Sequence, residues 1–260
     1  MSFFNSWPVR AAAVVVGVAC TFAAGMLVRG STAAPERGQI EAIIKDYLLN
    51  NPAVVRLALE EMERAAKADE ESKKQQAVAD LGPQLFSSKF QAVLGNPTGK
   101  IQLVEFFDYN CGYCKHAAED LATILKSNSD VRVVLKEFPV LGPGSVEAAQ
   151  VALALHKQFD GQKYWDFHRK LLASRGQIGR AQALSMAQET GADMEKLQAD
   201  MKSDDVRSGL AEVMKIADTL GMNGTPSYVV GDEIVVGAVG AEQLQGKIDN
   251  LRKCGKTACI

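Results

Sequence analysis

The stretch I-Q-L-V-E-F-F-D-Y-N-C-G-Y-C-K-H, residues 101–116, decides the fold prediction because it joins a strand pattern directly to a helix pattern. Its first seven residues form a largely apolar run, which is typical of a strand buried in a sheet. Apolar residues then recur at helical spacing from 115 to 126. Cys111 and Cys114 therefore fall where the chain passes from a strand into a helix.

The position of Cys111 at a helix start predicts a reactive thiol. The first turn of a helix presents unpaired backbone N–H groups and the positive end of the helix dipole, and both stabilise a thiolate. We therefore expect a depressed pKa at Cys111. Cys114 follows one turn later on the same face, within bonding reach. One thiolate can attack a disulfide and the second can displace the product, so the pair is interpreted as a redox centre.

Two other uses of paired cysteines fit the sequence less well. Haem attachment requires a histidine directly after the second cysteine, and Lys115 stands there instead. A zinc site would need two more ligands. His116 could supply one, but His156 and His168 lie in a later helical stretch without paired spacing. We therefore predict no metal and no cofactor, and we interpret His116 as a surface residue.

The sequence after the motif predicts an α/β arrangement. Residues 131–138 form a second apolar strand, so the chain makes a β-α-β unit in fewer than forty residues. A long helical stretch follows from about 145 to 220, interrupted by glycines. Two short strands and a last helix are then expected at residues 227–230, 233–236 and 241–253.

Length and charge limit the functional classes. The chain has 260 residues, a formal net charge of −2 and 47% hydrophobic residues. That length is enough for one well-buried core with accessory elements. A near-neutral charge provides no electrostatic footprint for nucleic acid, so we expect no nucleic-acid partner.

Residues 1–34 are interpreted as a signal peptide or an N-terminal membrane anchor. No charged residue occurs from Ala11 to Val28, and small residues at 23–25 and 32–34 provide cleavage signals. Eighteen apolar or small residues are also just long enough for an uncleaved anchor. Cys20 is interpreted as one residue of this apolar run. Either way the remainder is exported to the periplasm, soluble or tethered, where disulfides persist.

Residues 35–86 are predicted to form a helical oligomerisation stalk. One helix face collects apolar residues at i, i+3, i+4, i+7 and i+8, namely Ile40, Ile43, Ile44, Tyr47 and Leu48. Asn51-Pro52 should end this helix and begin a second one, with Asn51 as its N-cap. Two interpretations fit the apolar face. The helices either fold back on their own domain or associate with other copies of the chain.

Two further features lie towards the C-terminus. Cys254 and Cys259, with four residues between them, come after the last predicted helix and suggest a structural disulfide in an exported protein. The alternatives for this pair are a second redox-active pair that relays electrons and a metal-binding site. Gly224-Thr225-Pro226-Ser227 places a proline at the start of a strand, where the preceding peptide bond is either cis or an ordinary trans bond.

Three motifs together resemble the DsbA-type thioredoxin-fold family. They are V-E-F-F-D-Y-N-C-G-Y-C-K, K-E-F-P and G-T-P-S-Y-V-V-G-D, and the likeness extends over roughly residues 86–253. The resemblance implies an α/β thioredoxin fold with an inserted helical domain at about 145–220, within a DsbA-like domain at 87–260, preceded by the N-terminal helical stalk.

The resemblance also implies roles for individual residues. It makes Cys111 the exposed nucleophile, Cys114 its buried partner and Pro226 a cis-proline beside them. The backbone of Thr225 and Pro226 would then pair with an extended client peptide. Glu105 matches the family's buried acidic residue and Lys136 matches the lysine that can pair with it. A buried carboxyl with a raised pKa can move protons during exchange.

Two departures distinguish this chain from strongly oxidising family members. Gly112 and Tyr113 stand between the cysteines, as in the DsbC isomerases, where oxidising members carry Pro-His. Thr225 before the proline is isomerase-like as well. Because the dipeptide tunes thiolate stability, we expect a less oxidising pair. The segment 38–86 is similar to the oligomerisation region of ScsC-like proteins, which implies a homo-oligomer with a trimer as the ScsC-like arrangement.

The sequence therefore predicts a protein disulfide isomerase or reductase that acts on exported client proteins. A DsbD-like membrane reductase would keep its cysteines reduced. The alternative enzyme is a DsbA-like dithiol oxidase served by a DsbB-like membrane oxidase. The alternative of another class is a copper-binding periplasmic protein, because a soft thiolate pair suits Cu(I).

Overall fold

The computed structural model describes residues 36–259, which divide into two units at Arg64 and Ala65. The predicted signal peptide or anchor at residues 1–34 lies outside the described residues. Between residues 36 and 259 no helix is both long and apolar enough to cross a membrane.

The described part of the first unit is helical. It contains α2 (Arg37–Asn50) and the beginning of α3 (Pro52–Asp80). The two helices are separated at Asn51, where the sequence predicted a break. The side chain of Asn51 was expected to cap the second helix, but its amide donates to the carbonyl oxygen of Tyr47 at 2.8 Å. Asn51 therefore caps the end of α2. No residue of α2 is buried.

The second unit is built on a mixed sheet. Its described strands lie in the order β1-β3-β2-β4-β5, and only β2 and β3 are parallel neighbours. The strands are β1 (Val93–Gly95), β2 (Ile101–Phe107), β3 (Val131–Glu137), β4 (Ser227–Val230) and β5 (Glu233–Val236). Helix α5 (Gly112–Ser127) connects β2 to β3, so the predicted β-α-β unit is confirmed. The edge strand β1 was not predicted.

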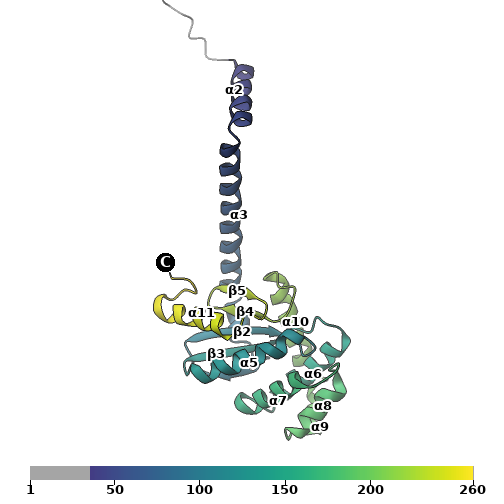
Figure 1. Cartoon of the computed structure of the whole chain (residues 1–260). Coiled ribbons are helices and arrows are strands. Elements are labelled where there is room, and N and C mark those ends of the chain that lie inside the picture. The colour runs from purple at the N-terminus through teal and green to yellow at the C-terminus, as the bar shows by residue number, and fades with distance from the viewer. Residues whose placement is uncertain (1–35, 260) are drawn as a thin grey trace, which may run out of the picture. The chain divides into compact units, whose positions relative to one another are not determined.

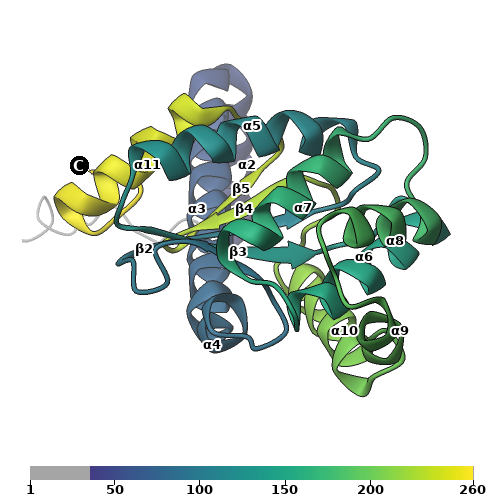
Figure 2. The same ribbon diagram turned by 90° about the horizontal axis from the view of Figure 1, so that it is seen from below.

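The helices follow the predicted order (Figure 1). Between β3 and β4 the chain inserts a series of helices, which confirms the expected helical insertion. These are α6 (Pro143–His156), α7 (Gly161–Ala173), α8 (Arg180–Glu189), α9 (Met194–Asp200) and α10 (Asp204–Thr219). The short helix α4 (Gly82–Phe86) precedes the sheet and α11 (Ala241–Cys254) follows it. Figure 2 shows α5 and α11 on one side of the sheet and α4 and α10 on the other.

Strand β2 is buried on both faces because each face is covered by helices. Successive side chains of a strand point to opposite faces. Accordingly, Leu103 and Phe107 pack in the cluster that includes α5, whereas Val104 and Phe106 pack in the cluster that includes α4 and α10. Cys111, four residues beyond the end of β2, belongs to the first cluster.

The end of the predicted stalk packs with the second unit. Val78 in α3 and Leu85 in α4 are buried at 2% and 0% exposure, in the same cluster as Phe106. The carbonyl oxygens of Gln84 and Phe86 accept hydrogen bonds from side chains of β3. Residues 77–86 therefore supply part of the core on this face of the sheet.

Candidate active site

Cys111 is the N-cap residue of α5, and the helix begins at Gly112. The backbone N–H of Cys114 donates to the Cys111 carbonyl oxygen at 3.1 Å, which closes the first turn. Both cysteines are free thiols. Cys114 is fully buried, and Cys111 is only 6% exposed, so the expectation of an exposed nucleophile is corrected. Tyr113 between them is 72% exposed.

Cys111 is covered because the loop before β4 lies against it. The Cys111 sulfur is 3.1 Å from the carbonyl oxygen of Thr225, to which the thiol donates in its protonated form. The Thr225–Pro226 peptide bond is cis, as the family resemblance implies. Two hydrogen bonds define this loop: the Ser227 hydroxyl donates to the Gly224 oxygen at 2.8 Å, and the Gly237 N–H donates to the Pro226 oxygen at 2.9 Å. The nucleophile therefore lies between a helix start and a fixed backbone carbonyl.

The two thiols differ strongly in acidity. A hydrogen bond from the Cys114 thiol lowers the pKa of Cys111 to about 5, and the backbone N–H groups of Cys114 and Tyr113 act in the same direction. The pKa of Cys114 is raised, first because its proton is held by Cys111 and then because it is buried. At neutral pH the arrangement therefore provides one nucleophilic thiolate and one protonated thiol.

Glu105 is the buried acidic group of the site. It is 2% exposed on β2, and burial raises its pKa to about 8, although a hydrogen bond with Tyr228 opposes the shift. Tyr228 is its register partner on β4. The Oε2 atom of Glu105 has no hydrogen-bond partner among residues 36–259. The charge of Glu105 contributes to the raised pKa of Cys114, so the two groups interact.

Lys136 does not pair with Glu105, which corrects the expectation from the resemblance. In the β2–β3 register Glu105 lies beside Leu135, whereas Lys136 lies beside Phe106. Neighbouring positions of a strand face opposite sides, so the two side chains lie on different faces of the sheet. The Lys136 Nζ atom donates to the Gln84 oxygen at 2.6 Å and lies 3.4 Å from a Glu212 oxygen.

Sequence reasoning missed the role of Asp108 at the end of β2. One oxygen of its buried carboxylate accepts the backbone N–H groups of Val140 and Leu141, each at 2.9 Å. The other accepts the N–H of Asn110 at 2.8 Å. Asp108 therefore fixes the loop after β3 to the loop that carries Cys111. Its place at the start of the D-Y-N-C motif was the available signal.

A buried polar network lies beside the same loop. The Glu137 carboxyl accepts hydrogen bonds from Tyr109 at 3.3 Å and Tyr164 at 3.0 Å, and the Tyr109 hydroxyl is 3.3 Å from His168 Nδ1. Burial raises the pKa of Glu137 and lowers the pKa of His168 to about 3. His168 is therefore neutral at pH 7, and the network connects Tyr109 to β3 and α7.

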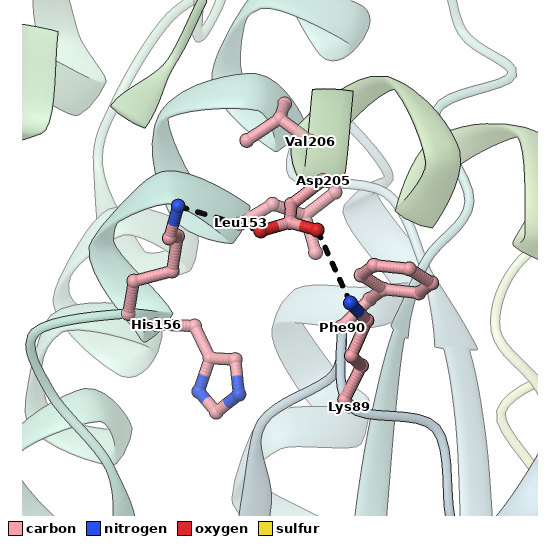
Figure 3. A pocket seen from close by; sticks show the side chains of 7 residues that line it. Lys89, Phe90, Leu153, His156, Asp205 and Val206 are labelled. Carbon is pink, nitrogen blue, oxygen red and sulfur yellow. Dashed lines mark hydrogen bonds and ion pairs between the residues drawn. The ribbon is translucent and has the colours of Figure 1, made fainter. Parts of the chain in front are cut away.

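The three histidines lie in different surroundings. His116 is exposed on α5, with Nδ1 3.1 Å from the Gly112 carbonyl oxygen. His168 belongs to the buried network. His156 lines a small cavity of about 40 Å³ whose rim carries Lys89 and Asp205, paired at 3.4 Å (Figure 3). Within residues 36–259 no group of three or more His, Cys, Asp or Glu side chains could hold a metal ion.

At the C-terminus, Cys254 and Cys259 form a disulfide. The Asn250 side-chain amide donates to the Thr257 carbonyl oxygen at 2.8 Å inside the short loop that the disulfide closes. The disulfide therefore ties the last described residues to the end of α11.

Comparison with solved structures finds matches that cover 66% to 86% of this chain. A thioredoxin-like oxidoreductase from Silicibacter pomeroyi DSS-3 is 42% identical, with 66% of this chain and 98% of that chain covered and a TM-score of 0.62. The catalytic domain of Proteus mirabilis ScsC is 30% identical, with 68% and 97% covered and a TM-score of 0.62. A linker-deletion mutant of the same ScsC is 27% identical, with 86% and 99% covered and a TM-score of 0.65.

Among curated proteins, the probable disulfide bond formation protein D of Bacillus cereus is 26% identical over 165 residues, which cover 59% of this chain and 76% of that protein. The Na(+)/H(+) antiporter NhaA 1 of Salinispora arenicola is 25% identical over 158 residues. The chain spans only 24% of the length of that antiporter.

The family comparison covers most of the sheet, together with the cysteine pair and the helical insertion. The model of the DSBA-like thioredoxin domain matches residues 102–249, which begin in β2 and end in α11. More than half of the chain is therefore accounted for by one family, and the chain belongs to the DSBA-like thioredoxin domain family.

Proposed function

We propose that the protein catalyses thiol–disulfide exchange on exported proteins, with Cys111 as the nucleophile. The observation that carries the proposal is the pair of free cysteines at the start of α5, with Cys111 as the N-cap residue. There Cys114 donates its proton towards Cys111 and lowers the pKa of Cys111 to about 5. A thiol with that pKa is almost fully ionised at neutral pH, and the thiolate is the attacking form.

The chemistry proceeds by two sulfur displacements. The Cys111 thiolate attacks one sulfur of a client disulfide, which forms a mixed disulfide and releases the other client sulfur as a thiolate. In reduction, Cys114 loses its proton and attacks Cys111, so a Cys111–Cys114 disulfide forms and two electrons pass to the client. In isomerisation, the freed client thiolate attacks a second client disulfide, and the thiolate released there attacks the client sulfur of the mixed disulfide. Cys111 then leaves as a thiolate, with no net electron transfer.

Glu105 is proposed to take the Cys114 proton during the second displacement. Its unpartnered Oε2 atom and its pKa of about 8 support this role, because such a carboxyl exchanges protons near neutral pH. Thr225 is proposed to pair with client backbone once the Cys111 thiol has released its carbonyl oxygen. Lys136, on the other face of the sheet, is proposed to act only through packing.

We propose the isomerase or reductase direction over net oxidation. Gly112 and the largely exposed Tyr113 add no positive charge beside the thiolate, which supports a less oxidising pair than a Pro-His dipeptide would give. A DsbA-like oxidase is the alternative. Changing Gly112-Tyr113 to Pro-His should raise the reduction potential by about 30 mV for each unit by which the Cys111 pKa falls.

We also propose that the protein works in the periplasm as a homo-oligomer assembled through residues 36–64. The exposed apolar side chains of α2 and early α3 support this, and a trimer is the ScsC-like arrangement. Their exposed fractions reach 66% at Ile43 and 67% at Met62. An assembly would surround a misfolded client with several Cys111 sites and keep them from a membrane oxidase. A DsbD-like reductase would then supply electrons.

Two assays test the proposal. The first is the equilibrium of the purified protein with glutathione, and the second is reactivation of scrambled ribonuclease. Cys111→Ser should abolish both exchange activities, while Cys114→Ser should accumulate mixed disulfides with client. Wild-type protein that neither exchanges with glutathione nor reactivates ribonuclease would overturn the assignment. Oxidation of reduced ribonuclease without reactivation of the scrambled form would favour the oxidase.

A further inference from the structure

Two residues that flank the Cys111–Cys114 motif bind the same loop of the helical insertion. Asn110 directly precedes Cys111, and Lys115 directly follows Cys114. The loop connects α7 to α8 and comprises residues 174–179; we call it the α7–α8 loop. It has no regular secondary structure, and three of its residues are exposed.

The contacts of Asn110 resemble those between neighbouring strands. Its Nδ2 atom donates to the Ile178 carbonyl oxygen at 2.8 Å, and its Oδ1 atom accepts the Ile178 N–H at 2.7 Å. The backbone N–H and carbonyl groups of Ile178 are thus both hydrogen-bonded to the side chain of Asn110. Ile178 itself is fully buried, so this contact attaches the end of the α7–α8 loop to the core next to Cys111.

The contact of Lys115 fixes the other end of the loop. Its Nζ atom donates to the Ser174 carbonyl oxygen at 2.8 Å. Ser174 is the residue that ends α7, so the ammonium also lies at the negative end of a helix dipole. The loop is therefore attached at Ser174 and at Ile178. The residues that hold it, Asn110 and Lys115, lie on either side of the two cysteines in the sequence.

We propose that Asn110 and Lys115 are positioning residues: by fastening the α7–α8 loop to both ends of the Cys111–Cys114 turn, they hold that turn in the orientation needed for exchange. The proposal deepens the thiol–disulfide exchange proposed above and rests on it. Neither residue donates to a sulfur atom in this structure, and both act through the backbone that they hold.

The physical reason lies in the angular dependence of hydrogen bonds. The thiolate of Cys111 is stabilised by the Cys114 thiol and by backbone N–H groups of the first turn, and such contacts weaken steeply when the donor angle changes. When Cys111 bonds to a client, its contact with the Thr225 oxygen is lost. The contacts of Asn110 and Lys115 do not involve sulfur, so they can keep Cys114 aligned behind Cys111 throughout the reaction.

The test compares Asn110→Ala and Lys115→Met with wild type by two client-free measurements. Hydrogen exchange of the Ile178 amide should become at least tenfold faster in Asn110→Ala, because its acceptor is gone. The pH profile of Cys111 alkylation should shift upwards in both variants. A shift of half a unit would slow alkylation at pH 4.5 about two- to threefold. The resolution of mixed disulfides should also slow.

Matched controls separate positioning from other causes. Ser145→Ala removes a third contact of Asn110, at 3.0 Å, but leaves the α7–α8 loop attached, so the alkylation profile should not move. Lys115→Arg keeps both the donor and the charge and should restore the wild-type profile. A shift caused only by the lost Lys115 charge would disappear at 1 M salt, whereas a shift caused by a loosened turn would remain.

Three results would overturn the proposal. They are a lower melting temperature with an unchanged alkylation profile in both variants, a profile shift in Asn110→Ala alone, or a shift in Lys115→Met that salt abolishes. If Asn110→Ala does not fold, Lys115→Met and Lys115→Arg decide between the outcomes. Because both client-free measurements need no exchange activity, failure of the proposed function would appear separately, in the glutathione equilibrium of the wild-type protein.

Discussion

Helices α2 and α5 carry the same kind of apolar pattern but differ in what covers it. In α2 the residues Ile40, Ile43 and Ile44 repeat at i, i+3 and i+4, and they are 42–66% exposed. In α5 the residues Leu121 and Ile124 follow the same spacing and are at most 1% exposed. The pattern thus predicts which face is apolar, whereas the covering surface depends on the neighbouring elements.

The neighbours of α5 follow from its connections. A helix that links two parallel strands must pack on the sheet that they form, so β2 and β3 supply its covering surface. The described part of the first unit holds no strand, and it buries no residue of α2. Contiguous exposed apolar surface of this kind is typical of an interaction site. The comparison therefore separates side chains that stabilise the fold from side chains available for association.

Two truncations give the strongest test of this separation. A chain that begins at Ala65 should fold as a monomer, because the apolar side chains that it lacks between residues 36 and 64 are exposed. A chain that begins at Ser87 should lose most of its stability, since Val78 and Leu85 each contribute about 1.5–3 kcal/mol through burial. It also removes the Gln84 oxygen that accepts a hydrogen bond from the buried Lys136 ammonium, and such a bond to a charged group contributes about 1.5–3 kcal/mol.

Thermal melts and light scattering on both chains provide the measurement, with the full chain as reference. The separation would be wrong if the chain beginning at Ala65 unfolded at a much lower temperature, or if it stayed oligomeric.

Two single substitutions compare a buried apolar side chain of α5 with an exposed one of α2. Leu121→Ala in α5 should lower the free energy of unfolding by about 2–5 kcal/mol, because it leaves a cavity in the core. Ile43→Ala in α2 should leave unfolding of the second unit unchanged and weaken self-association. Urea denaturation and concentration-dependent sedimentation would measure the two effects. An equal loss of folding stability in both variants would contradict the distinction between the helices.

Local sequence signals predicted the elements better than they predicted the contacts between them. The strands at 101–107, 227–230 and 233–236 have the predicted bounds, because turn residues and apolar runs mark both ends. The three-residue strand β1 was missed because it is too short for any periodicity. The cysteine pair was identified because its spacing and its place after a strand are both local.

The wrong predictions at the site concern contacts between segments that are far apart in the sequence. Whether Glu105 and Lys136 share a face depends on the register of β2 against β3, which neither strand encodes alone. The burial of Cys111 depends on the Thr225 loop, which lies 114 residues later in the chain. The charge-rich composition of α3 gave no sign that its last turns pack beneath the sheet at Val78.

Because Glu105 is buried in the second unit, the free energy of unfolding of that unit should depend on pH. Glu105 has a folded-state pKa raised from 4.5 to about 8, so the folded protein holds a proton that the unfolded chain releases. Its favourable contribution is complete below pH 4.5 and is lost as the pH rises through 8. Relative to wild type, Glu105→Gln should therefore gain stability across that interval, by about 1.4 kcal/mol for each unit of the shift.

Urea denaturation from pH 4 to 9 would measure this gain, with Cys111→Ser and Cys114→Ser in both proteins to remove thiol titration. A stability difference that does not change with pH would show that Glu105 is not held protonated.

The smallest expected effect compares the two helix starts directly. Glu36 is the exposed N-cap of α2, as Cys111 is the buried N-cap of α5. A Glu36→Cys thiol is exposed, where solvent screens the helix terminus, so its pKa should stay at about 8.5. At pH 6 Cys111 is then about 90% ionised and the new thiol about 0.3%. Because nucleophilicity falls with pKa, the net advantage of Cys111 shrinks to roughly tenfold. Above pH 9 the order should reverse, since both thiols are ionised and the more basic one attacks faster.

Iodoacetamide labelling followed by peptide mass spectrometry resolves each site in one sample. Two pH profiles with the same midpoint would show that the helix start alone determines thiol acidity, and that the Cys114 contact contributes nothing.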